Sequence, residues 1–359
     1  MKRNNVENPF QIMDSHKNKY HTKLKNERNE MVHGINFDIQ ENEIVGIVGE
    51  SGSGKSISSL AILGLLDKKT TELKGSISFE GNNIIELKEK ELRKFRGCEI
   101  SMIFQEPMSS LNPSITCGAQ VIEILQQHQK ISKKEGRAEV IRLFEKVKLP
   151  RVTEMFDLYP HQISGGQMQR VMIAMAIACE PTMLIADEPT TALDVTIQAQ
   201  ILDLLKDLQQ ETDMAIVLIT HDLGVVARMA DEVLVMYAGQ VVEKGPVDDI
   251  FYRSAHPYTL GLRGAMPSND PQNNQQLTAI DGSPPDLFSP PKGCGYHPRC
   301  PNAMVLCNQR APVIESLSEQ HWSRCWLHHA NSEQRPQGLY FRPSAAQPNR
   351  TPEQKGTSQ

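Results

Sequence analysis

The sequence predicts an α/β protein built on a mostly parallel β-sheet. Three short apolar runs carry this prediction, at residues 183–186, 216–220 and 233–236. Between the first two runs, apolar residues recur at helical spacing: Ile197, Ile201, Leu204, Leu205 and Leu208. Buried strands that alternate with amphipathic helices form parallel sheets with helices packed on their faces.

Composition and charge narrow the class of protein. The 359 residues are 39% hydrophobic and 23% charged, enough for one large core and an appended domain. A net charge of −5 and a pI near 6.1 argue against nucleic acid as the main partner. The longest apolar run, 171–179, is too short to span a membrane, and the N-terminus lacks the apolar stretch of a secretion signal. We expect a cytoplasmic protein that sits on a membrane without crossing it.

The chain divides into four segments. Residues 1–30 are rich in Asn, Lys and Glu and support a first strand only weakly. Residues 31–245 form the main domain, with strands at 35–39, 44–48 and 76–79 and a helical part at about 116–180. Residues 246–330 form a Pro-rich C-terminal domain, and residues 331–359, rich in Gln, Pro, Ser and Asn, are expected to be disordered.

Residues 49–56 match the phosphate-binding pattern G-x-x-x-x-G-K-[ST] in full: Gly49, Glu50, Ser51, Gly52, Ser53, Gly54, Lys55 and Ser56. The apolar run 44–48 and the helical spacing of 57–66 supply the strand and helix that the motif requires. Glycines let backbone N–H groups curl around a β-phosphate at a helix N-terminus. Lys55 would reach the β- and γ-phosphates, and Ser56 would offer its hydroxyl to Mg²⁺. The alternative, a glycine-rich turn without a ligand, fits this context poorly.

The apolar strand at 183–186 ends in two carboxylates, Asp187 and Glu188. At the C-terminal edge of a parallel sheet, both can address one site. In phosphoryl transfer the first acid would hold the Mg²⁺ shell, and the second would polarise the attacking water. A solvated strand end is the alternative, but Ser164–Gln167, ahead of a helix predicted from Met168, favours the functional interpretation.

Six motifs in this order resemble those of ABC-transporter ATPases: Gly49–Ser56, Gln105, Ser164–Gln167, Asp187-Glu188, Ala192–Asp194 and His221. The resemblance covers about residues 31–330. Four stretches are similar to the peptide-importer branch, and within it to the D subunits of dipeptide and oligopeptide permeases: Phe104–Pro113, Ala186–Asp194, Thr220–Leu223 and His256–Thr259. The resemblance implies a P-loop NTPase fold with a parallel-sheet core, an antiparallel β subdomain, a helical signature subdomain and a small cysteine-containing C-terminal extension.

The resemblance also implies a head-to-tail pair of ATPase subunits with nucleotide held between them. The phosphate loop of one subunit would face the signature of the other, which here is Ser164, Gly165, Gly166 and Gln167. A helix N-terminus with this sequence suits a γ-phosphate. A simple helix cap is the alternative interpretation.

Further roles follow from the same resemblance. Gln105 would contact Mg²⁺ or the water and pass the nucleotide state to residues 106–113, which approach the membrane subunits. His221 would hydrogen-bond the γ-phosphate and Glu188. Asp194 would communicate across the dimer, or cap the helix that begins near Val195. Adenine would stack on Tyr20, although the residues before Tyr20 do not alternate as the family's first strand does, and an exposed tyrosine is the alternative.

Four of the seven cysteines gather near the C-terminus: Cys294, Cys300, Cys307 and Cys325. Their intervals of five, six and seventeen residues are unlike the tight pairs of structural zinc sites. Four thiolates can hold a [4Fe–4S] cluster at irregular spacing, and the pattern is similar to that of peptide-importer D subunits, some of which carry one. Zinc or buried free thiols remain the alternatives.

The sequence therefore predicts the ATP-hydrolysing subunit of an importer for di- or oligopeptides. It would use ATP and Mg²⁺ on the cytoplasmic face of the inner membrane. Its partners would be a second, similar ATPase, two membrane permeases and an external binding protein. Nickel chelates, glutathione or antimicrobial peptides are alternative cargoes. A soluble, non-transport ATPase and a metal- or redox-sensing protein are the competing classes, but one phosphate loop, no long heptad run and intact motif residues disfavour both.

Overall fold

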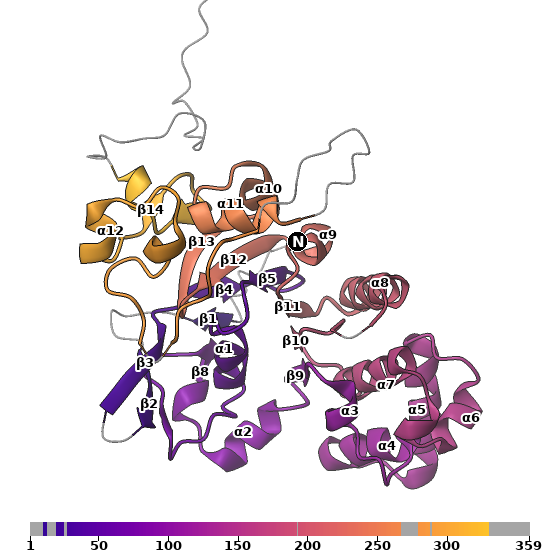
Figure 1. The fold of residues 1–359 in the computed structure, drawn as a ribbon. Coiled ribbons are helices and arrows are strands. Elements are labelled where there is room, and N and C mark those ends of the chain that lie inside the picture. Colours follow the sequence, from indigo (N-terminus) through magenta and orange to yellow (C-terminus); the bar gives the residue numbers. More distant parts are fainter. Residues whose placement is uncertain are drawn as a thin grey trace, which may run out of the picture.

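The computed structural model of the chain describes residues 10–12, 19–24, 27–191, 193–266, 279–287 and 289–329. Within them, eight strands form the main sheet (Figure 1), in the order β14-β15-β13-β12-β5-β11-β10-β9. These strands are β5 (Ile44–Val48), β9 (Ile100–Ile103), β10 (Met183–Asp187), β11 (Ala215–Thr220), β12 (Glu232–Tyr237), β13 (Gln240–Pro246), β14 (Glu315–Ser316) and β15 (Trp322–Ser323). Strands β12, β5, β11, β10 and β9 are parallel, and β13, β15 and β14 extend the sheet antiparallel.

The main sheet lies between two hydrophobic cores, and the side chains of the central strand β5 point alternately into one core and the other. Ile44 and Val48 of β5 join one cluster of buried residues, whereas Val45 and Ile47 join the other. Successive side chains of a strand point to opposite faces, so a continuous apolar run is what a strand covered on both sides requires. The predicted α/β class with a parallel core is confirmed.

Shorter strands form two smaller antiparallel sheets in the described chain, ordered β4-β1-β7-β8 and β3-β2-β6. Their bounds are β1 (Phe10–Ile12), β2 (Lys19–Leu24), β3 (Glu27–His33), β4 (Phe37–Ile39), β6 (Thr71–Glu72), β7 (Ser78–Phe79) and β8 (Asn82–Asn83). The weakly supported N-terminal segment thus contributes strands, and β1 pairs with both β4 and β7. The turn between β4 and β5 contains Asn42, whose φ of 59° lies in the left-handed region that Asn tolerates.

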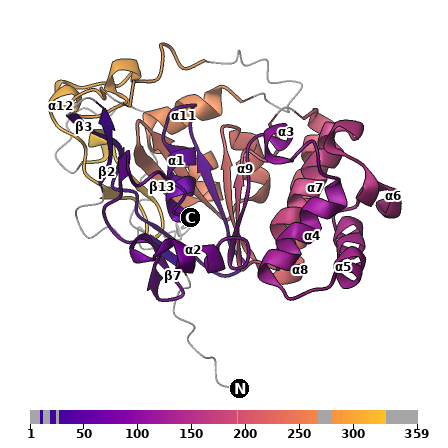
Figure 2. The same ribbon diagram turned by 90° about the horizontal axis from the view of Figure 1, so that it is seen from below.

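Helices α3–α7 form a group at one side of the sheet (Figures 1 and 2), and α4–α7 lie within residues 116–180, where the sequence predicts a helical part. The helices are α1 (Lys55–Ile62), α2 (Glu89–Phe95), α3 (Pro107–Ser110), α4 (Cys117–His128), α5 (Lys133–Lys146), α6 (Val152–Asp157), α7 (Gly165–Ile177), α8 (Val195–Thr212), α9 (Leu223–Met229), α10 (Val247–Tyr252), α11 (Pro257–Gly264) and α12 (Val305–Gln309). Short 3-10 turns cover Ile84–Glu86, Pro160–Gln162, His297–Arg299 and Trp326–His328. Helix α7 begins three residues before the predicted Met168, because Ser164 caps it.

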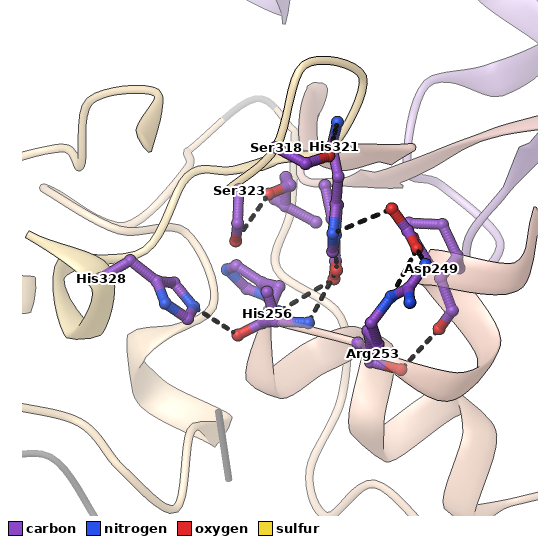
Figure 3. A network of polar contacts seen from close by, with 12 residues as sticks. Asp249, Arg253, His256, Ser318, His321, Ser323 and His328 are labelled. Atoms are coloured by element: carbon purple, nitrogen blue, oxygen red, sulfur yellow. Dashed lines mark hydrogen bonds and ion pairs between the residues drawn. The ribbon is translucent and has the colours of Figure 1, made fainter. Parts of the chain in front are cut away.

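The C-terminal extension, residues 247–329, joins the main sheet through a buried polar network (Figure 3). The carboxylate of Glu243 on β13 is fully buried and accepts the backbone N–H groups of Ala255 at 2.7 Å and His256 at 2.9 Å. It also contacts His321 Nε2 at 2.8 Å. A buried carboxylate needs such partners to offset its lost hydration. The extension is therefore fixed to β13 by polar contacts as well as by the pairing of β13 with β15.

No helix in the described ranges is both long enough and apolar enough to cross a membrane.

Candidate functional site

The phosphate loop follows β5 and leads into α1, as its sequence predicts. Gly54 precedes α1 with a φ of 99°, and Gly52 has a φ of 78°, conformations that side chains disfavour. A Cβ at Gly49 would lie 2.2 Å from the carbonyl oxygen of Met236, so the backbones pass too closely for any side chain. The loop conformation therefore depends on its glycines.

Two polar groups of the loop are buried. Lys55 Nζ donates to the carbonyl oxygens of Gly49 at 2.7 Å and Glu50 at 3.0 Å, and burial lowers its pKa. The hydroxyl of Ser53, 4% exposed, has no hydrogen-bond partner among the described residues. An unpaired buried hydroxyl is costly, so a ligand with oxygen atoms in the loop would relieve it.

The first carboxylate of the acidic pair lies beside the loop. Ser56 Oγ donates to Asp187 Oδ1 at 3.3 Å, which joins the start of α1 to the end of β10. Asp187 is buried, and this burial raises its pKa above the usual range. A hydroxyl and a carboxylate at this spacing are the oxygen ligands that Mg²⁺ prefers, and a cation would offset the buried charge.

The second carboxylate, Glu188, contacts side chains from two other motifs. Gln105 Nε2 donates to its Oε2 at 2.8 Å, and His221 Nδ1 lies 3.2 Å from its Oε1. Three residues predicted from distant motifs are thus brought together. Their parent strands β9, β10 and β11 are parallel neighbours, so their C-terminal ends meet at one edge of the sheet.

Thr191 also contacts this carboxylate and was missed by the sequence analysis. Its Oγ1 donates to Glu188 Oε2 at 2.8 Å. Burial would raise the pKa of Glu188, but the hydrogen bonds from Thr191 and His221, together with the nearby positive charge of Lys55, outweigh burial and lower it. A carboxylate with a lowered pKa is ionised at neutral pH, which suits a group that orients water.

Glu188 also has a φ of 47°, which is rare for a residue with a side chain and costs free energy. Its backbone N–H donates to the carbonyl oxygen of Ile219, and that hydrogen bond holds the conformation. Neither the strained backbone nor the Thr191 contact has a signal in the sequence.

The signature residues begin α7. Ser164 Oγ accepts the N–H of Gln167 at 3.3 Å, and Gln167 Oε1 accepts the N–H of Ser164 at 2.9 Å. These two hydrogen bonds form a capping box, so the residues do cap the helix, as the alternative interpretation has it. Capping α7 is compatible with a role in binding a phosphate. A Cβ at Gly166 would lie 2.8 Å from Ile197 Cγ2, and one at Gly165 would lie 3.6 Å from Leu193 Cδ2, so the signature packs beside the start of α8.

Figures 1 and 2 place α7 within the helical group, apart from α1 and the phosphate loop. Asp194 caps α8, with its Oδ1 accepting the N–H of Ile197 at 3.0 Å. The structure therefore keeps α7, which the signature begins, apart from α1, which follows the phosphate loop.

Tyr20 lies in β2, and its side chain is outside the described part of the structure. Its backbone pairs with that of Val32 on β3. Val32 in turn lies beside the loop, because a Cβ at Gly54 would come within 3.3 Å of Val32 Cγ2.

The four C-terminal cysteines line one small pocket together with residues of α11 and of the last 3-10 turn. Burial raises the pKa of Cys294 to about 11 and also raises that of Cys300. Within the described ranges, however, no group of three or more His, Cys, Asp or Glu side chains is arranged to hold a metal ion. The structure gathers the predicted cysteines around a pocket but does not arrange them as a ligand set.

Comparison with known proteins divides the chain into two matched parts. A family model described as ABC transporter matches residues 32–191, and one described as the oligopeptide/dipeptide transporter C-terminal region matches residues 242–307. The dipeptide transport ATP-binding protein DppD of Bacillus subtilis is 52% identical over 303 residues, covering 84% of this chain and 90% of that protein. The oligopeptide transport ATP-binding protein OppD of Salmonella typhimurium is 50% identical over 295 residues, covering 82% and 87%.

Among solved structures, the chain is similar to a dimeric post-hydrolysis state of the ATP-binding cassette MJ0796 bound to ADP and phosphate. The TM-score is 0.58 at 31% identity, over 66% of this chain and 98% of that one. A second, from Clostridium perfringens, is cbiO1, part of an ABC transporter complex, with a TM-score of 0.57 at 27% identity over 71% and 95%.

Proposed function

Because this chain belongs to the ATP-binding subunits of ABC transporters, in the dipeptide and oligopeptide branch, we propose that it hydrolyses ATP to drive the uptake of di- or oligopeptides. The contact of Gln105 and His221 with one ionised carboxylate, Glu188, carries this proposal. That carboxylate stands beside a phosphate loop, where an attacking water has to be oriented.

The nucleotide would lie on the phosphate loop, Gly49 to Ser56. Backbone N–H groups and Lys55 would bind its phosphates, and the unpaired hydroxyl of Ser53 supports an oxygen-rich ligand there. Ser56 and Asp187, with Gln105, would hold Mg²⁺, which would neutralise charge on the phosphates. The pairing of Tyr20 with Val32, beside the loop, supports adenine stacking on Tyr20.

Within this site Glu188 would take the proton of the attacking water as general base. Gln105 and Thr191 orient its carboxylate, and His221 would hydrogen-bond it and the γ-phosphate. The lowered pKa of Glu188 keeps the carboxylate ready to accept a proton at neutral pH.

The signature Ser164–Gln167 would complete the site of a second, similar ATPase. The separation of α7 from the phosphate loop supports this arrangement, because the chain does not bring both motifs to one point. Asp194, beside the signature, would lie at the same interface. Two membrane permeases and an external binding protein would complete the transporter, and the chain would sit on the cytoplasmic face of the inner membrane.

Affinity purification from solubilised native membranes tests this proposal. We expect a second ATPase and two multi-span permeases to co-purify, with the external binding protein identifying the cargo. Ribosomes or DNA-repair proteins in their place would overturn the transport function in favour of a soluble ATPase. Dipeptides, longer peptides, nickel chelates and glutathione are then distinguished by uptake of the labelled compounds into cells that lack this chain.

We also propose that Cys294, Cys300, Cys307 and Cys325 hold a [4Fe–4S] cluster of structural role, since ATP hydrolysis needs no redox step. Their shared pocket supports this, whereas the lack of a ready ligand set in the described residues opposes it. Thiols with raised pKa values lose their protons when a metal binds. Iron, sulfide and zinc assays on anaerobically purified protein test this proposal. Four irons per chain would support the cluster, one zinc per chain would indicate a zinc site instead, and the absence of both metals would indicate free thiols.

A further inference from the structure

The C-terminal extension binds the carboxylate of Glu50, the second residue of the phosphate loop. Arg299 Nη1 donates to Glu50 Oε2 at 2.6 Å, and Nη2 donates to Glu50 Oε1 at 3.0 Å. The two residues are 249 positions apart in the chain. The Arg299 side chain is 5% exposed and that of Glu50 26% exposed, so water screens this ion pair weakly.

Arg299 is itself held in place by the extension and the main sheet. Its Nε donates to the carbonyl oxygen of Asp281 at 2.8 Å, and Nη2 donates to that of Ile280 at 3.2 Å. Nη1 also donates to Tyr237 Oη at 3.3 Å. A planar guanidinium whose donors are all directed has little freedom to follow Glu50 elsewhere.

The other polar groups of Glu50 are also bound. Its backbone N–H donates to Tyr258 Oη at 2.8 Å, and its carbonyl oxygen accepts from Lys55 Nζ. Tyr258 is fully buried and packs against Tyr237 and Tyr296, at ring-centroid distances of 4.6 and 5.3 Å. The phosphate loop is therefore held from the side of the extension at both the backbone and the side chain of one residue.

The negative charge of the Glu50 carboxylate affects how well the phosphate loop can bind a nucleotide. A carboxylate in a loop that wraps a polyphosphate repels the ligand, and Asp187 and Glu188 already bring negative charge to Lys55. An arginine that pairs with the carboxylate cancels its charge and fixes its direction.

We propose that Arg299 is a positioning residue for ATP binding, which holds the Glu50 carboxylate against the C-terminal extension and cancels its charge. The inference rests on the proposed role of residues 49–56 as the ATP site. It assigns to the extension a part in nucleotide binding, through Glu50.

Two measurements test it: the Kd of a non-hydrolysable ATP analogue on the full chain, and KM and kcat for ATP on the assembled transporter. Arg299→Met should raise Kd and KM about tenfold, the middle of the range for coupled neighbours, with a smaller change in kcat. Glu50→Gln in the Arg299→Met background should recover most of the lost affinity, because the repelling charge is gone. Arg299→Lys, which keeps the charge but loses the fork, should fall between wild type and Arg299→Met.

The controls separate this inference from the proposed function. Arg310→Met alters an exposed arginine of the same extension and should leave Kd unchanged. Lys55→Ala should abolish binding; if it binds ATP normally, residues 49–56 are not the ATP site and the proposed function fails. If Lys55→Ala fails to bind but Arg299→Met and the double variant bind equally weakly, Arg299 does not act through Glu50 and the inference is wrong. The inference is also wrong if a folded Arg299→Met variant binds the ATP analogue with an unchanged Kd. If Arg299→Met does not fold, the Kd values of Arg299→Lys with and without Glu50→Gln are compared in the same way.

Discussion

Gln105 Nε2 donates to Glu188 Oε2 at 2.8 Å, joining the end of β9 to the end of β10 across 83 residues of sequence. Only Glu106 separates Gln105 from α3, which lies at the edge of the helical group. A shift of that group would therefore pull on the residue that orients the carboxylate. Coupling between the helices and hydrolysis needs such a contact, with two ends on different parts of the fold.

Glu188→Gln should lower kcat for ATP by about 10³-fold, within the range for loss of a general base, and leave ATP binding intact. The amide keeps the shape of the side chain but cannot take a proton. ATPase turnover and ATP-analogue affinity on the same preparation check this, with the exposed Glu154→Gln as the matched control. Undiminished turnover would assign the base to another group.

Thr191→Val should move the acid limb of the kcat profile to higher pH. The hydrogen bond from Thr191 helps to lower the pKa of Glu188, so its loss raises that pKa. A base with a higher pKa becomes protonated at a higher pH, and activity is lost sooner as the pH falls. Turnover measured from about pH 3.5 to about pH 8, a range that includes the ordinary pKa of a glutamate, tests this against Thr196→Val, an exposed position on α8; coincident profiles for the two variants would contradict the role of Thr191.

Glu243→Leu should destabilise the C-terminal extension by about 3 kcal/mol, because the buried N–H groups of Ala255 and His256 lose their acceptor. Both tryptophans of the chain, Trp322 and Trp326, lie in the extension, so intrinsic fluorescence during urea unfolding reports on this region. The exposed Glu319→Leu is the matched control. An unshifted midpoint for Glu243→Leu would show that the network in Figure 3 contributes nothing to stability.

His256→Asn should make the protein less sensitive to acid. Burial lowers the pKa of His256 from 6.5 to about 3, and its Nδ1 accepts the N–H of Tyr258. Between those pH values the unfolded chain binds a proton that the folded chain does not, so stability falls as the pH falls, by at most about 1.4 kcal/mol per pH unit. Asparagine can accept the same hydrogen bond without titrating. Melting temperatures at pH 7 and pH 5 should differ less for this variant than for wild type or His161→Asn.

Local signals explain which features the sequence could predict. The phosphate loop, the acidic pair and the strands β5, β10 and β11 are each coded within a few consecutive residues. Strand β1 is three residues long, too short for an alternating pattern to stand out. Thr191 and Arg299 have no local signal at all, because each acts through a contact that exists only after the chain has folded.

The four C-terminal cysteines also show a limit of prediction from the sequence. Their gathering near the C-terminus and the resemblance to peptide-importer D subunits predict a shared site, and the fold does bring them to one pocket. Spacing alone does not fix the directions of sulfur atoms, however, and the structure does not arrange them as ligands.

The pairing of β13 with β15 protects an edge of the main sheet from pairing with other chains. Without residues 315–323, the seven-residue β13 would be the open border of the sheet, with backbone groups available to any other extended chain. The extension covers part of that border and leaves the two-residue β14 outermost. A chain cut after residue 246 would thus expose the whole edge of β13 to pairing with other extended chains.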